Sequence, residues 1–154
     1  MNIWQFQKIV TQRLQQWAGA SIFLGMIMQW PANKTARGIG VQFVGWGLIN
    51  AAIAFFGQRA TQKRQQQANA HTLITLTRET KNLRRLLWVN SGLDLFYMAG
   101  GWWLARRRGR DSLHWRGQGI GIMLQGGFLF LFDYAHARVL NDPTPISINN
   151  SSKK

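Results

Sequence analysis

Long apolar segments alternate with polar connections along most of the chain. Four apolar segments stand out, at residues 17–30, 39–56, 86–105 and 119–137. About 20 residues of α-helix cross the hydrocarbon core of a bilayer, and the last three segments have about that length. The pattern predicts an all-α integral membrane four-helix bundle. It forms a single transmembrane domain, residues 1–140, followed by a disordered polar tail, residues 141–154.

A stripe of apolar residues precedes the first segment. Its members recur at helical spacing and are Ile3, Phe6, Val10, Leu14 and Trp17. The following "PANKTARG" offers no small-x-small cleavage pattern, so the first segment is interpreted as a retained span. We therefore expect an amphipathic N-terminal helix that extends this short span and lies on the membrane surface before the chain enters the bilayer.

The connections differ in length and composition. Residues 58–85 are polar and basic and contain neither glycine nor proline, so nothing forces a helix to stop at the membrane surface. We expect the second and third spans to continue as helices into this segment and to turn near residues 69–72. The connections "PANKTARG" and "RRRGRDSLHWRG" are short.

The net charge of +14 comes from 19 Lys and Arg against 5 Asp and Glu. A soluble protein with this charge would be expected to bind a polyanion, but here the basic residues lie in short runs between apolar segments, as in membrane proteins. The expected partners are therefore the lipid bilayer and the anionic lipid headgroups near the Arg runs "LRR" and "RRRGR", and no nucleic acid. Alternatively, these runs only set the topology. The distribution of Lys and Arg favours both termini in the cytoplasm, in a bacterial cytoplasmic membrane.

Several kinds of chemistry find no support in the sequence. The chain has no cysteine, which excludes disulfides and thiol chemistry. Its three histidines, His71, His114 and His136, lack the spacing of a zinc site or of a haem held between spans. The glycine-rich "GQGIGIMLQGG" has no P-loop lysine after it. We expect no metal and no cofactor, and the sequence does not favour an enzyme.

An acidic residue interrupts the third span, "LRRLLWVNSGLDLFYMAGGWWLARRR". Asp94 lies near its centre, where a charge costs about 2.5–3.5 kcal/mol and is tolerable only if it faces the interior of the bundle. Asn90 and Tyr97 lie about one turn away on the same side of the helix. The sequence therefore predicts that this side of the span faces inward and is polar.

Other polar residues fall at similar depths when each residue is assigned about 1.5 Å of rise. Gln42 lies nearer the outer surface, and His136 follows Asp133 by one turn and could hydrogen-bond it. We predict one buried polar cluster, formed by Asp94, Asp133, Asn50, Asn90, Gln125, Tyr97, Gln42 and His136.

Two interpretations of this cluster compete. Polar groups between spans can hold helices together, with about 0.6–2 kcal/mol for each hydrogen bond. Two carboxylates are more than such packing needs, and intramembrane acids commonly serve function. Asp94 and Asp133 would then hold an ion, a proton or a small polar ligand, with transport as one use. The alternative is a non-catalytic subunit or assembly factor of a larger membrane complex, and a homo-oligomer is also open.

Two further patterns bear on the fold. Gly38, Gln42 and Asn50 recur at one constant offset as Gly121, Gln125 and Asp133, a hint of two duplicated helical hairpins. The strings "QFVGWGLINAAIAFFG", "NSGLDLFYMAGG" and "GIGIMLQGGFLFLFDYAHA" resemble a family of small four-span bacterial membrane proteins of uncharacterised function. This resemblance implies four spans and groups the polar residues of spans two to four together. It implies no activity.

Overall fold

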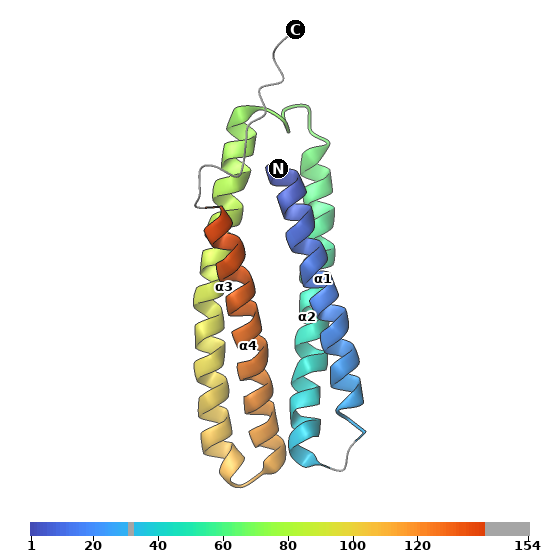
Figure 1. Cartoon of the computed structure of the whole chain (residues 1–154), viewed down its shortest axis with the longest axis vertical. Coiled ribbons are helices and arrows are strands. Elements are labelled where there is room, and N and C mark those ends of the chain that lie inside the picture. The colour runs from blue at the N-terminus through green and yellow to red at the C-terminus, as the bar shows by residue number, and fades with distance from the viewer. Residues whose placement is uncertain (31–32, 141–154) are drawn as a thin grey trace.

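Four long helices form an antiparallel bundle in the computed structural model, which describes residues 1–30 and 33–140 (Figure 1). They are α1 (Ile3–Ile27), α2 (Lys34–Gln65), α3 (Leu73–Arg107) and α4 (Leu113–Val139), with a 3-10 turn, η1 (Arg108–Arg110), between the last two. The described residues contain no strand, so the all-α prediction is confirmed. The predicted disordered tail lies outside the described residues.

The helices pair as two hairpins, α1 with α2 and α3 with α4 (Figure 1). We call the end that holds the N-terminus, residues 66–72 and the end of α4 the terminal end. The opposite end, with the α1–α2 and α3–α4 connections, is the hairpin end. The duplication suggested by the sequence stays a prediction, although two hairpins are the arrangement it implies.

Side-chain caps fix where the helices begin. Asn2 and Gln5 form a capping box at the start of α1, and Asn33 accepts from the backbone of Thr35 and Ala36 at the start of α2. Thr72 caps α3. These bonds satisfy backbone donors that a helix N-terminus otherwise leaves unpaired. As expected for a segment without glycine or proline, α2 and α3 extend far into residues 58–85, and the chain turns within residues 66–72.

The N-terminal apolar stripe lies inside the bundle, which corrects the expectation of a helix on the membrane surface. Ile3, Phe6 and Val10 are 1%, 4% and 7% exposed and belong to a core cluster with residues of the other helices. The stripe is the first half of α1, which is continuous with the first predicted span. Because α2 and α3 extend beyond their predicted spans, they give this half of α1 a protein surface to pack on.

Away from the terminal end, glycines bring the helix backbones close together. A Cβ on Gly101 of α3 would lie 2.7 Å from the carbonyl oxygen of Gly119 on α4. The same distance separates a Cβ on Gly25 of α1 from the carbonyl oxygen of Gly40 on α2. Similar contacts join α2 to α4, whereas α2 and α3 hardly touch. Small residues that allow such close approach are typical of helix packing in membranes.

Two of the four helices, α2 and α4, are long and apolar enough to cross a membrane. Only 28% of the apolar window of α2 and 39% of that of α4 are buried, so most residues of both windows are at least partly exposed. In the part of the chain that the structure describes, α1 and α3 do not meet the same criterion. The structure thus supports two candidate spans, and four spans remain a prediction.

The adjacent glycines Gly100 and Gly101 test the role of close backbone contact. We expect Gly101→Ala to lower the free energy of unfolding by about 1–3 kcal/mol, because the added Cβ meets the backbone of α4. Gly100→Ala meets no atom within 4 Å and should raise it by about 0.5–1 kcal/mol through helix propensity. Circular dichroism during denaturation of the purified protein measures both. Equal effects from the two substitutions would contradict the packing described here.

Candidate functional site

A cavity of about 820 Å³ lies between the two hairpins, in the half of the bundle toward the terminal end. All four helices contribute to its walls. The middle of the cavity is apolar, and its lining there includes Leu14, Ile53, Ala54, Leu83 and Leu87. The space exists because α2 and α3 do not pack against each other. Its volume falls in the range of about 300–1,000 Å³ that is usual for ligand sites.

Asn90 and Asp133 line the cavity at the level farthest from the terminal end. Asp133 is 8% exposed, and no basic side chain of residues 1–30 and 33–140 forms an ion pair with it. The structure therefore brings Asn90 of α3 and Asp133 of α4 onto one wall, as the depth argument predicted. A carboxylate in this position can accept hydrogen bonds or neutralise a positive charge in the cavity.

Three more buried polar residues do not line the cavity but lie within about one helical turn of residues that do. Asn50, Ser91 and Asp94 are 3%, 3% and 4% exposed. Each has a buried polar atom without a hydrogen-bond partner, namely Asn50 Nδ2, Ser91 Oγ and Asp94 Oδ2. Buried polar atoms are nearly always bonded, so such atoms call for a water, an ion or a ligand. Ser91 was not predicted from the sequence, because a serine in a span usually serves only helix packing.

Gln125 and Gln42 belong to other hydrogen-bond systems. Gln125 is fully buried; its Oε1 accepts from Trp17 Nε1 at 3.1 Å, and its Nε2 donates to Ser21 Oγ at 3.1 Å. Gln42 Nε2 donates to Gln118 Oε1 at 2.9 Å. These bonds join α4 to α1 and to α2, so both side chains are used to hold helices together.

Tyr97 is not buried with the other polar residues, contrary to the prediction. It is 42% exposed, and its ring meets that of Trp46 edge-on, with centroids 4.9 Å apart. Because α3 packs on α4 and not on α2, the side of α3 that faces α2 stays partly open. Tyr97 spans this gap toward Trp46 on α2.

His136 is buried but does not bond Asp133, although the sequence allowed it. Its Nδ1 lies 2.6 Å from the carbonyl oxygen of Phe132, and its Nε2 lies 3.2 Å from a guanidinium nitrogen of Arg13. These partners fit a neutral ring that donates to Phe132 and accepts from Arg13. With both nitrogens bonded within the protein, His136 has a structural role between α4 and α1.

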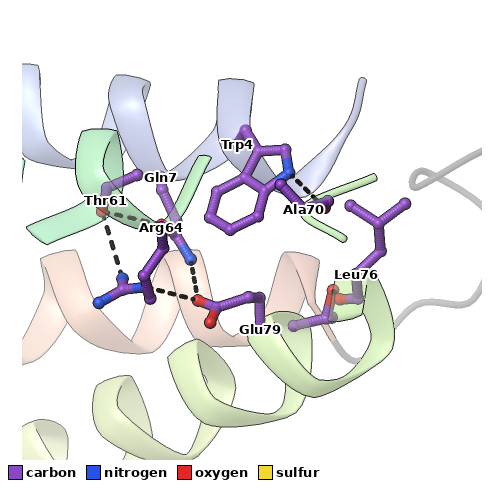
Figure 2. Close-up of polar contacts among 8 residues, drawn as sticks. Trp4, Gln7, Thr61, Arg64, Ala70, Leu76 and Glu79 are labelled. Atoms are coloured by element: carbon purple, nitrogen blue, oxygen red, sulfur yellow. Dashed lines mark hydrogen bonds and ion pairs between the residues drawn. The ribbon is translucent and has the colours of Figure 1, made fainter. Parts of the chain in front are cut away.

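A polar network closes the cavity toward the terminal end (Figure 2). Glu79 is only 6% exposed; its Oε2 lies 3.3 Å from Arg64 Nε and accepts from Gln7 Nε2 at 3.3 Å. Thr61 Oγ1 donates to Gln7 Oε1 at 2.9 Å. The network connects α1, α2 and α3. The network was not predicted from the sequence, although Glu79 is the one acid in residues 58–85 and lies one turn from Leu76 and Leu83.

No group of three or more histidine, aspartate and glutamate side chains converges in the described residues in the manner of a metal centre. The two interior acids are accompanied by neutral oxygen and nitrogen atoms. This arrangement can hydrogen-bond a polar solute or offer oxygen ligands to a cation that keeps part of its water.

The architecture defines a helical bundle with a partly polar cavity between its hairpins. Residues 13–134 match DUF6992, a family of unknown function. This range covers most of the chain, which therefore belongs to that family. The finding agrees with the resemblance to an uncharacterised family and assigns no activity. Neither a curated protein nor a solved structure matches the chain.

The ion pair of Arg64 and Glu79 is asymmetric in burial, with side chains 42% and 8% exposed. Arg64→Met would leave a buried carboxylate with one hydrogen-bond donor, and we expect it to destabilise the protein by about 1–3 kcal/mol. Glu79→Gln keeps a side-chain acceptor and leaves Arg64 in contact with solvent, so its cost should stay below about 1 kcal/mol. Denaturant unfolding compares the two variants, and a larger cost for Glu79→Gln would overturn this account.

Proposed function

We propose that the chain is a small integral membrane protein whose interior binds a cation, or a small polar ligand with a positively charged group, at Asp133 and Asp94. One observation carries the proposal. The chain has 19 basic residues, yet neither buried acid forms an ion pair with any basic residue that the structure describes. Buried acids are normally paired, protonated or bound to a cation.

The outer surface supports insertion into a membrane. Large apolar side chains are exposed along the middle of the bundle, including Phe23, Ile49, Phe56, Phe96 and Leu131 at 60%, 50%, 67%, 76% and 64%. Soluble monomers rarely expose large continuous apolar patches. A bilayer would cover this surface at no cost, because lipid chains are as apolar as the side chains.

Arginine side chains over aromatic rings support two membrane boundaries. Four such pairs occur in the described residues, Arg59 with Phe55, Arg138 with Tyr134, Arg106 with Trp102 and Arg108 with Trp115. Aromatic rings and arginines with apolar stems favour the interface between lipid and water. Trp115 and Tyr134, near the two ends of α4, are about 28 Å apart along the helix axis. A bilayer core is about 30 Å thick.

The chemistry of the interior favours a positively charged occupant. Asp94 and Asp133 would repel each other if both were ionised, and a charge at the centre of a bilayer, near which Asp94 is predicted to lie, costs about 2.5–3.5 kcal/mol. A bound cation or a proton removes both penalties. Asn90, on the wall with Asp133, and the unpartnered Ser91 Oγ near Asp94 add hydrogen-bonding capacity. The cavity of about 820 Å³ leaves room for water or for an organic cation.

A second candidate function has its own support at the terminal end. Leu73 and Ile74 are 57% and 81% exposed, although they lie beyond the predicted third span. Exposed apolar residues outside the lipid suit contact with another protein. As a non-catalytic subunit, the chain would purify in mild detergent with a partner in fixed stoichiometry. A monomer or a homodimer in the same experiment would count against this candidate.

Cation binding is tested by thermal unfolding in detergent with sodium, potassium, magnesium, ammonium and alkylammonium salts at constant ionic strength. A cation that binds the folded state stabilises it by about 2.7 kcal/mol at a hundred times its Kd. We expect at least one cation of this panel to stabilise the wild type. Asp133→Asn should abolish this stabilisation, because it removes the carboxylate that lines the cavity.

The matched control is Asp111→Asn, since Asp111 is an exposed acid in the α3–α4 connection. This variant should respond to the cation as the wild type does. The proposal fails if no cation stabilises the wild type, or if Asp133→Asn and Asp94→Asn both keep the full response.

A further inference from the structure

The end of the cavity near the polar network is basic. Arg78 and Asn82 line it together with Arg64, and only Arg64 forms an ion pair, with Glu79. Arg78 and Asn82 also line a shallow groove that contains Lys81. The cavity and the groove therefore share a rim on α3. With Arg64 matched by Glu79, the charges of Arg78 and Lys81 are left to attract an anion.

This basic rim lies at the depth of lipid headgroups if the bundle is inserted as proposed. The third span was predicted to begin at residue 86. Asn82 and Arg78 are then about 6 Å and 12 Å beyond the hydrocarbon edge, and the headgroup layer is about 5–7 Å thick on each side. Arginine side chains extend their charge over several ångströms toward the headgroups. Asn82 thus lies within the layer that carries lipid phosphate, and the Arg78 side chain reaches this layer by extending toward the bilayer.

The apolar middle of the cavity can hold the first part of a lipid chain. From the hydrocarbon edge at residue 86 to Asn90, α3 advances about 6 Å; one acyl chain covers about 15 Å, half of the bilayer core, so its remainder would extend into the surrounding bilayer. Ile53 on α2 and Leu86 on α3 line the cavity and are also 56% and 55% exposed. The cavity can therefore be reached from the lipid side, between α2 and α3.

We propose that this cavity holds one anionic phospholipid, with its phosphate at Arg78 and Asn82 and one acyl chain between α2 and α3. The chain would lie on Ile53, Leu83 and Leu87, which line the cavity. The lipid fills the gap that the two helices leave open. This inference shares membrane insertion with the proposed function but does not depend on a cation at Asp133.

The cavity combines a basic rim with an apolar middle, and an occupant has to match both parts. A small soluble anion would use the basic rim but would leave the apolar length empty. A lipid satisfies both parts of the cavity, since it carries a negative charge and a hydrocarbon chain on one molecule.

The test uses the full chain in nanodiscs of phosphatidylcholine with phosphatidylglycerol, followed by native mass spectrometry after release into detergent. Gly57→Leu places a side chain in the cavity, because Gly57 lines it. Gly45→Leu is the matched control, an exposed glycine of α2 outside the lining. A Cβ on either glycine meets no atom within 4 Å. Arg78→Gln removes the rim charge, and its control is Arg37→Gln, at an exposed arginine of the hairpin end that lies outside the cavity lining and outside the Arg runs.

We expect the wild type and both controls to retain one phosphatidylglycerol per chain, in preference to phosphatidylcholine. Gly57→Leu and Arg78→Gln should each reduce this retention at least fivefold. Equal retention by Arg78→Gln and Arg37→Gln would overturn the proposal, and so would equal retention by the two glycine variants. If Gly57→Leu does not fold, the comparison of Arg78→Gln with its control alone tests the proposal.

Inorganic phosphate supplies the last comparison. If it displaces phosphatidylglycerol at equal concentration, the site recognises a free anion and the lipid proposal is wrong. Persistence of the lipid in excess phosphate supports the contribution of the acyl chain. The cation experiment depends on Asp133, whereas the lipid experiment depends on Arg78 and Gly57. Loss of cation binding and loss of lipid binding can therefore be distinguished in the same preparations.

Discussion

Close contact between glycine backbones determines how the bundle is assembled. Gly25 and Gly40 join α1 to α2, and Gly101 and Gly119 join α3 to α4. The carbonyl oxygen of Thr35 on α2 lies where a side chain of Gly117 on α4 would be. These contacts join the helices in the order α1, α2, α4, α3. No such contact joins α2 to α3, and the cavity lies between these two helices, with walls from all four.

The bundle combines two ways of burying side chains. At the terminal end, large apolar residues such as Ile3, Trp4 and Phe6 form a core of the kind found in soluble proteins. Elsewhere the buried residues are mostly small, and large ones such as Phe96 face outward. This inversion suits a chain whose middle is solvated by lipid and whose terminal end meets water. The cavity crosses from one region to the other, which explains its mixed lining.

The sequence predicted the helices and their long extensions well because periodicity and the absence of helix breakers are local properties. It also identified Asp94 and Asp133 as buried acids. The partners of each polar residue were less predictable, since they depend on which helices touch. Gln125 forms its hydrogen bonds with residues of α1. Tyr97 is partly exposed because the backbones of α2 and α3 do not pack closely. Glu79 was missed because a basic, polar segment gives little sign that it covers a core.

Insertion of the bundle into a bilayer is the claim on which the cation site and the lipid site both depend. The chain has no cysteine, so single cysteines can be introduced at Phe96 and Ile74, two residues of α3 that are 76% and 81% exposed. Membranes carrying each variant are opened and treated with a charged maleimide. The account predicts that Ile74→Cys reacts, whereas Phe96→Cys reacts only after the protein is denatured in detergent. Equal labelling of both cysteines in intact bilayers would contradict membrane insertion.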